Sequence, residues 1–157
     1  MIRSIAPDDT ASLIALAESI GLFEPEQLEE LGQMLADAFS KNGDTDPFWI
    51  TDDDNGLVGL AYCEPERMTD GTWNLQLIGI HPTRQKQGRG TKILYFVEQT
   101  LAHRGARILL VETLGTADFE YVREFYRKNG YDEEARIREF YAAGQDKITF
   151  RKALADR

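Results

Sequence analysis

One heptapeptide constrains this chain more than any other segment. It lies between an apolar segment with strand character and a segment whose apolar residues recur at helical spacing. It consists of Gln85, Lys86, Gln87, Gly88, Arg89, Gly90 and Thr91. Two glycines two positions apart allow a tight turn that exposes backbone N–H groups, and a following helix adds the positive end of its dipole. The heptapeptide therefore predicts a strand, a loop that binds an anionic phosphate and a helix, in that order.

The charge around this loop supports a phosphate ligand. Four basic residues cluster there: Arg84, Lys86, Arg89 and Lys92. No Asp or Glu occurs between positions 71 and 97, although the whole chain has a formal net charge of -9. Crowded like charges repel unless an anion or solvent relieves them, so the loop indicates a polyphosphate ligand. The acidic balance argues against nucleic acid as a partner and, more weakly, for a cationic or amine-bearing substrate.

The spacing excludes two other phosphate-binding loops. A P-loop requires Gly, four residues and then Gly-Lys-Ser/Thr, and no segment matches that pattern. A dinucleotide-binding loop requires a third glycine three residues after the second, where this chain has Ile93. It also requires an acidic residue for the ribose at a later strand end, and none stands at a suitable distance.

The order of the motifs resembles the GNAT superfamily of N-acyltransferases. Gln-x-x-Gly-x-Gly, after a strand at 75–80 and the break His81-Pro82, is similar to the acyl-CoA pyrophosphate loop of that superfamily. Residues 124–131 resemble its downstream Phe-Tyr-x-x-x-Gly-Phe/Tyr segment. The resemblance covers most of the chain beyond residue 47. It implies an α/β fold: a single N-acetyltransferase-like domain over 1–157, with a mixed sheet of about seven strands flanked by about four helices.

The hydrophobic pattern predicts elements in a compatible order. Strands are expected at 2–5, 48–51, 57–63, 72–80, 108–111, 131–141 and 147–152. Helices are expected at 7–20, at 23–39, from 88 to about 105 and at 119–129. The central strand, the helix after the loop and the continuous apolar run at 108–111 predict a right-handed crossover between two parallel strands.

Composition bounds the remaining possibilities. A chain of 157 residues that is 42% hydrophobic and 29% charged fits one globular domain with a real core. No early apolar run approaches the length of a membrane span or a signal peptide, so we expect a cytoplasmic protein without a membrane partner. Cys63 is the only cysteine and the two histidines are far apart, so we expect no metal site and no internal disulfide.

The resemblance implies how the donor is held. In this superfamily the parallel strands separate at their ends, which leaves backbone groups of Ile78, Gly79 and Ile80 free to pair with the pantetheine arm of acetyl-CoA. The Ile80 N–H is expected to polarise the thioester carbonyl, and losing such a donor costs about 10²- to 10³-fold in rate. The N–H groups of residues 87–91 and the Thr91 hydroxyl would bind the pyrophosphate, with Gln85 and Lys86 beside it. Three candidates for the ribose 3′-phosphate are Lys86, Arg89 and Arg123.

Tyr126 is the candidate general acid. The resemblance places a tyrosine at this position of the helix, where it protonates or hydrogen-bonds the departing CoA thiolate. Since a free thiol has a pKa of about 8.5, the thiolate leaves readily and the hydrogen bond contributes a modest factor. An alternative is that Phe119, Val122 and Tyr126 form a core stripe, and the tyrosine can serve both purposes. Many members carry Asn where this chain has Phe119, so cofactor contacts from this helix stay open.

The general base is less defined. Glu112 and Glu64 lie at predicted strand ends and are candidates that act directly or through water, although solvated strand ends are the plainer interpretation. Asn74 cannot take a proton, and His81 precedes a proline in a turn. Cys63 has no evident histidine partner, so we expect direct attack in a ternary complex and no acyl-enzyme.

The acceptor site would be lined by the first two helices, the loop at 64–71 and the last hairpin near Phe140 and Tyr141. Carboxylates there that could attract a cationic amine are Glu24, Glu26, Glu66, Asp70 and Glu139, unless they are ordinary surface residues. The leading hypothesis is an acetyl-CoA-dependent N-acyltransferase that acts on a small amine, a peptide N-terminus or a lysine. An alternative is a CoA-binding sensor without turnover, and a weaker one is an unrelated nucleotide-binding module. The acceptor, the acyl length and any homodimer are not defined by the sequence.

Overall fold

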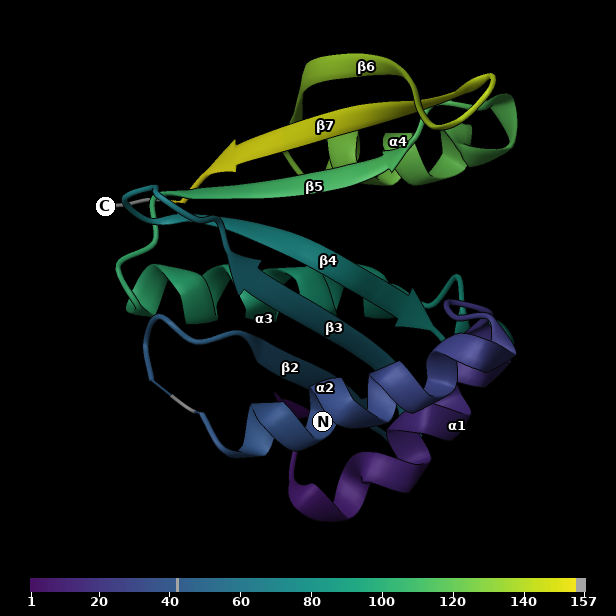
Figure 1. The fold of residues 1–157 in the computed structure, drawn as a ribbon, viewed down its shortest axis with the longest axis vertical. Coiled ribbons are helices and arrows are strands. Elements are labelled where there is room, and N and C mark those ends of the chain that lie inside the picture. The colour runs from purple at the N-terminus through teal and green to yellow at the C-terminus, as the bar shows by residue number, and fades with distance from the viewer. Residues whose placement is uncertain (42, 155–157) are drawn as a thin grey trace.

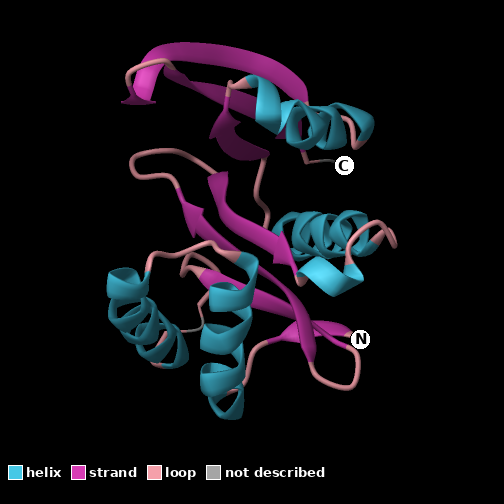
Figure 2. Cartoon of the chain, turned by 90° about the vertical axis from the view of Figure 1, so that its right-hand side faces the viewer, coloured by secondary structure: helices cyan, strands magenta, loops and turns pink. Residues whose placement is uncertain are grey.

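The computed structural model describes residues 1–41 and 43–154, which form a seven-stranded sheet with helices on both faces (Figures 1 and 2). In chain order the elements are β1 (Ile2–Ser4), α1 (Thr10–Ile20), α2 (Leu28–Phe39), β2 (Phe48–Asp53), β3 (Leu57–Pro65), β4 (Thr72–Ile80), α3 (Arg89–His103), β5 (Ile108–Leu114), α4 (Glu120–Lys128), β6 (Asp132–Ala142) and β7 (Gln145–Ala153). Short 3-10 turns precede α1, α2 and α4, and one lies between β4 and α3. None of the helices in these ranges is both long and apolar enough to cross a membrane.

The strand order is β1-β2-β3-β4-β5-β7-β6. All neighbouring strands are antiparallel except β4 and β5, which are parallel and are connected through α3. The predicted mixed sheet, its crossover and the four helices are therefore confirmed. The apolar run at 108–111 becomes the first part of β5, where Leu109 and Val111 are buried and Ile108 and Leu110 are partly exposed, because the two faces of the strand are covered unequally.

The sheet separates two apolar cores. Leu13 of α1 and Leu35 of α2 pack against Leu60 on one face. Ile93 of α3 packs with Phe150 of β7 in the core on the other face. Figure 2 shows α1 and α2 on one side of the sheet and α3 and α4 on the other. Because residues alternate between the faces of a strand, each face of β3 and β4 presents a different set of side chains.

Several element boundaries differ from the prediction, and two of the differences change the environment of named residues. β2 continues to Asp53, so the hairpin turn is the shorter segment 54–56, in which Asn55 and Gly56 have φ values of 57° and 127°. Tyr131 lies outside β6 and is only 3% exposed, because it turns into the core below α4. The first difference matters for the site, since it places Asp52 and Asp53 in a strand beside the predicted phosphate loop.

Candidate active site

The two parallel strands pair over only part of their length. The register runs from Thr72 opposite Ile108 to Leu75 opposite Val111, whereas β4 continues to Ile80 and β5 to Leu114. Figure 1 shows the two arrows diverging toward their C-terminal ends. The sheet is therefore split into two arms, β1–β4 and β5–β7, and the last residues of β4 have no strand on that side.

Backbone direction distinguishes the last residues of β4. The His81 N–H donates to Val58 O at 2.8 Å, so alternate residues direct their N–H and C=O groups to the opposite edge. Ile78 and Ile80 therefore face the gap, while Gly79 faces β3, where it lies opposite Leu60. The Ile80 carbonyl accepts from Gln85 Nε2 at 3.1 Å. The Ile80 N–H is directed into the gap.

This arrangement corrects the prediction for Gly79, because its backbone groups face β3 and do not line the gap. The absence of a side chain is what matters at this position. A Cβ on Gly79 would lie 3.1 and 3.2 Å from methyl carbons of Ile20 and 3.4 Å from Leu22. The glycine therefore allows α1 to approach β4 closely next to the gap.

The predicted phosphate loop lies directly after β4. Gly88 is the N-cap of α3 and has a φ of 78°, a conformation that side chains rarely adopt. The first hydrogen bond inside the helix is that of Lys92 N to Gly88 O, so the N–H groups of the preceding turn donate to no acceptor in the described ranges. Several exposed N–H groups at the positive end of a 15-residue helix form an anion-binding surface.

The charge of the loop is partly compensated within the protein. Arg89 forms ion pairs with Asp52 at 2.9 Å and Asp54 at 2.7 Å, and Arg84 also pairs with Asp54. Its Nε donates to Gln87 Oε1 at 2.9 Å. The Arg89 side chain therefore holds the loop against the β2–β3 hairpin and does not serve as a 3′-phosphate ligand in this arrangement. Lys86 and Lys92 form no ion pair with any described residue, so they remain the cations available to a phosphate.

The sequence analysis missed this role of the hairpin. The tract Asp52-Asp53-Asp54 was placed only in the connection between the strands predicted at 48–51 and 57–63, because no local spacing connects it to basic residues 30 or more positions away. The available signal was complementary charge, since the most acidic short tract of the chain and its most basic loop can neutralise each other.

Arg123 is also placed differently from the prediction. Its side chain is buried, and its guanidinium donates to Leu114 O at 2.7 Å, to Thr116 O at 2.8 Å and to Glu120 Oε1 at 2.9 Å. Those bonds satisfy carbonyls in the connection from β5 to α4, where no regular partner exists. The guanidinium thus stabilises this connection, and the three bonds engage both of its terminal nitrogens.

Tyr126 points from α4 into the core. The residue is 3% exposed, and its ring lies 5.6 Å from Phe150 and 5.7 Å from Tyr131, measured between centroids. Burial, with a smaller contribution from Cys63, raises the pKa of the phenol well above its usual value. Its hydroxyl makes no hydrogen bond to a described residue. Val122 packs against the same core but Phe119 does not, so the predicted core stripe is present only in part.

Glu112 lies at the point where the two arms separate. It follows Val111, the last β5 residue that pairs with β4, and stands opposite Thr149 of β7. Its carboxylate is 3.4 Å from Lys147 Nζ, and the side chain is 33% exposed. Burial, followed by the charge of Glu112, raises the pKa of Tyr141. The residues of β5 and of the last hairpin thus meet on one side of the gap.

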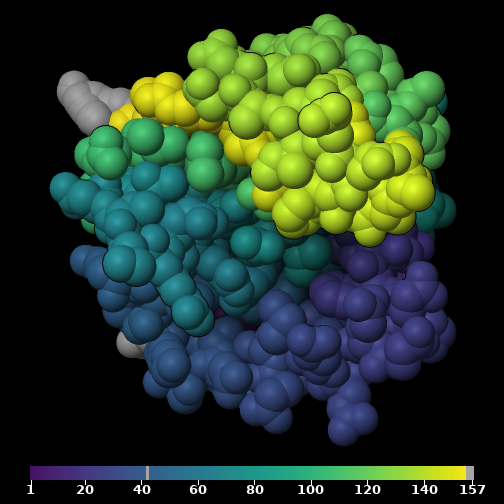
Figure 3. All heavy atoms as spheres, turned by 45° about the horizontal axis from the view of Figure 1, so that its top comes forward, coloured from purple at the N-terminus to yellow at the C-terminus, as the bar shows by residue number. Residues whose placement is uncertain are grey.

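The second candidate base is engaged elsewhere. Glu64 Oε2 accepts from the Tyr62 hydroxyl at 2.6 Å, and Asn74 Nδ2 donates to Glu66 Oε1 at 3.2 Å. These four side chains form a polar group along β3 and β4. Figure 3 shows a hollow between the purple-blue N-terminal helices and the yellow-green C-terminal hairpin, with the teal central strands below. The hollow lies between the segments predicted to bind the acceptor.

The other predicted residues have local roles. His81 caps the turn after β4 by accepting from Thr83 N at 3.2 Å. Cys63 is fully buried, and burial raises the pKa of its thiol, which makes the thiolate unfavourable. Four of the five carboxylates predicted near the acceptor site lie at the exposed surface: Glu24, Glu26, Asp70 and Glu139. Within the described ranges, no three His, Cys, Asp or Glu side chains converge on a possible metal site.

A family model described as an acetyltransferase (GNAT) domain matches residues 44–133, which is more than half of the chain. The search of curated proteins gave no match.

Several solved structures share the fold. A protein from Desulfovibrio desulfuricans assigned to the GNAT acetyltransferase family is 29% identical, with a TM-score of 0.88 over 98% of each chain. An aminoglycoside 6′-N-acetyltransferase complexed with coenzyme A is 19% identical, with a TM-score of 0.79 over 100% of this chain and 98% of that one. The ribosomal-protein-S18-alanine N-acetyltransferase of Escherichia coli is 18% identical, with a TM-score of 0.76 over 100% of this chain and 95% of that one. The last two similarities concern the fold alone.

Proposed function

The chain belongs to the GNAT family of acetyltransferases, and from that membership we propose that it transfers acetyl from acetyl-CoA to a primary amine by direct attack in a ternary complex. One observation carries the proposal: the separation of β4 from β5 beside a loop with exposed N–H groups. A thioester arm needs backbone partners and a pyrophosphate needs a cluster of donors, and both lie next to each other here. The residues of this chain would bind and orient acetyl-CoA, and acetyl-CoA would supply the acyl group and the leaving thiol.

In the proposed complex, Ile78 and Ile80 pair with the pantetheine arm. The Ile80 N–H is suited to stabilise the oxyanion, because it is directed into the gap and the Ile80 carbonyl is held by Gln85. Residues 87–91 bind the pyrophosphate through their N–H groups, with the Thr91 hydroxyl as a further donor. Lys86 or Lys92 would meet a phosphate oxygen, since neither is paired within the described part of the chain.

Tyr126 would donate a proton or a hydrogen bond to the departing thiolate. Its raised pKa keeps the phenol neutral throughout the usual assay range, so it stays a donor at every pH at which the enzyme is tested. Glu112 would accept the proton of the ammonium, directly or through water. Its position at the start of the gap supports that role.

Several acceptors remain compatible with this site. Two structural neighbours with similar TM-scores are named for an aminoglycoside and for a protein alanine, so fold similarity does not identify the acceptor. A small amine, a peptide N-terminus and a lysine belong in the first substrate panel.

The test is a titration with acetyl-CoA followed by thiol release over time with that panel. Wild type, Tyr126→Phe and Tyr121→Phe are compared, because Tyr121 lies on the same helix and is 76% exposed. We expect amine-dependent release that falls about 10- to 100-fold in Tyr126→Phe, near the low end for general acids, and is unchanged in Tyr121→Phe. Tight binding without release would favour a CoA sensor, and absence of binding would refute the cofactor assignment.

A further inference from the structure

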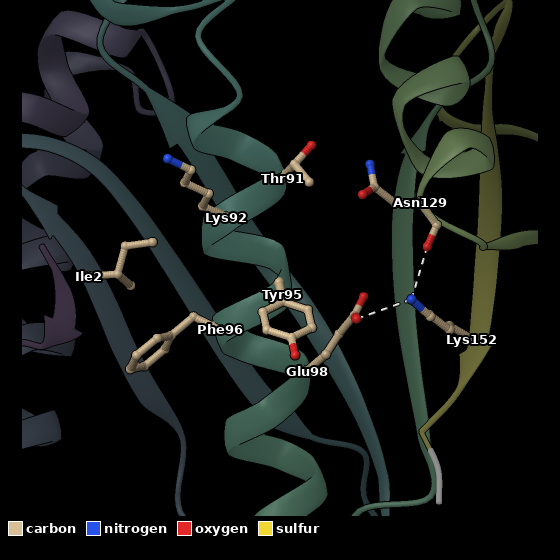
Figure 4. A pocket seen from close by; sticks show the side chains of 8 residues that line it. All are labelled: Ile2, Thr91, Lys92, Tyr95, Phe96, Glu98, Asn129 and Lys152. Atoms are coloured by element: carbon tan, nitrogen blue, oxygen red, sulfur yellow. Dashed lines mark hydrogen bonds and ion pairs between the residues drawn. The ribbon is translucent and has the colours of Figure 1, made fainter.

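A buried polar network connects the two arms of the sheet on the side of α3 and α4. Glu98 of α3 is 8% exposed, and its Oε2 accepts from the Tyr131 hydroxyl at 2.6 Å. Its Oε1 lies 3.1 Å from Lys152 Nζ, which also donates to Asn129 O at 2.9 Å. Figure 4 shows Glu98, Asn129 and Lys152 of this network in the cleft of about 490 Å³ between α3 on one side and α4 and β7 on the other.

The location of this network allows it to influence the spacing of the two arms beside the gap. α3 packs against β2, β3 and β4 of the first arm, whereas Tyr131 and Lys152 belong to the second arm. Beyond Leu75 no backbone ladder joins β4 to β5, so side chains between the arms set their spacing. Charge-assisted hydrogen bonds are directional and short, and burial strengthens them relative to solvent-exposed ones. The network therefore fixes the distance between α3 and the start of β6 more firmly than apolar packing alone.

Tyr131 also forms one wall of the pocket that holds Tyr126. The two rings meet edge to face with centroids 5.7 Å apart and planes at 69°. The Tyr131 N–H donates to Tyr126 O at 3.0 Å, so the two residues are also joined through the backbone. Since the Tyr126 hydroxyl has no hydrogen-bond partner among the described residues, ring packing alone sets its position. A shift of the Tyr131 ring is thereby transmitted to the phenol of Tyr126.

We propose that Tyr131 and Glu98 are positioning residues that set the location of the Tyr126 hydroxyl relative to the gap between β4 and β5. The proposal rests on the proposed function, because it assigns Tyr126 a role at the leaving thiol. Neither residue touches the reacting atoms. Glu98 holds the Tyr131 hydroxyl, and Tyr131 holds the Tyr126 ring. Small displacements of a catalytic group lower the rate of the chemical step while they leave cofactor binding nearly unchanged.

A double-mutant cycle tests the inference. Tyr131→Phe removes only the hydroxyl and keeps the ring, and Tyr126→Phe removes the hydroxyl that it is proposed to position. We expect Tyr131→Phe to lower kcat about 3- to 10-fold in the wild-type background and less than about 2-fold in the Tyr126→Phe background. The dissociation constant of acetyl-CoA, measured by calorimetry, should change less than about 2-fold in both backgrounds. Tyr95→Phe is the matched control, because Tyr95 lines the same cleft but is 62% exposed.

A second variant, Glu98→Gln, keeps the inference testable if Tyr131→Phe fails to fold. Glu98→Gln keeps an oxygen that can accept from Tyr131 and removes the charge, so it should lower kcat by a smaller factor with the same dependence on Tyr126. An equal loss in both backgrounds for either variant would overturn the inference, because a general structural role does not depend on the Tyr126 hydroxyl. If the wild-type protein binds acetyl-CoA but releases no thiol with any amine, the proposed function itself fails and the inference falls with it.

Discussion

Gly59→Ala should destabilise the protein by overpacking beside the phosphate loop. A Cβ on Gly59 would lie 2.7 Å from Cδ1 of Ile93, the fifth residue of α3, and 2.9 Å from Cδ1 of Ile80, the last residue of β4. Both distances are shorter than carbon atoms tolerate, so the ends of the two isoleucine side chains must move, and Ile93 is fully buried with little room to do so. Overpacking costs about 1–3 kcal/mol, and the lower entropy of the unfolded alanine chain returns about 0.4–1 kcal/mol. The middles of the two ranges give an expected net loss in free energy of unfolding of about 1.3 kcal/mol.

Urea denaturation monitored by circular dichroism measures that loss. The decisive comparison is with Ile93→Val, which removes the methyl that the new Cβ meets. Alone, Ile93→Val should cost about 0.5–1.5 kcal/mol, but in the Gly59→Ala background it should cost less or be stabilising. Additive effects of the two substitutions, or a Gly59→Ala protein as stable as wild type, would refute the reasoning. Gly32→Ala is the control, since its Cβ would meet only Ile14 at 3.9 Å and it should gain about 0.5–1 kcal/mol in helix stability.

Three further predictions concern charge. Arg89→Met should lower the free energy of unfolding, because it leaves the buried Asp52 carboxylate with only the more distant N-terminal ammonium. Urea denaturation would measure the loss, and an unchanged midpoint would show that the pair contributes nothing. Lys92→Met should weaken acetyl-CoA binding about 3- to 10-fold at low salt and less at high salt, as calorimetry at two ionic strengths would measure, whereas an equal effect at both would exclude a phosphate contact. The pKa values of Tyr126 and Tyr131 are raised by burial, and for Tyr131 also by Glu98, so their stabilisation is complete below the unfolded pKa of about 10 and is lost as pH rises above it. Urea denaturation at pH 8 and 10.5 should show a loss on the order of 1 kcal/mol for each, and Tyr131→Phe should lose less than wild type.

Residues close together in the sequence made part of the candidate site predictable, whereas the rest depends on residues far apart in the sequence. The phosphate loop, the strand before it and the helix after it were predicted because each depends on residues adjacent in sequence. Glycine spacing sets the turn, and apolar periodicity sets the helix. The environments of Arg89 and Arg123 were not predicted, because long basic side chains reach partners that no local pattern specifies. A basic cluster indicates available charge only after its internal partners are known.

The sequence by itself determined the order of the elements, the parallel crossover and the position of the loop with its exposed N–H groups. Those features arise from interactions within a few residues and from the alternation of apolar positions. Only the tertiary structure decided where β4 leaves β5, that the Gly79 backbone faces β3, and that Glu98 meets Tyr131. These contacts join residues more than 30 positions apart or depend on which edge of a strand is free. Sequence patterns specify which face of a strand or helix is apolar. Strand register and the pairing of buried polar groups are fixed only when the arms of the sheet pack together.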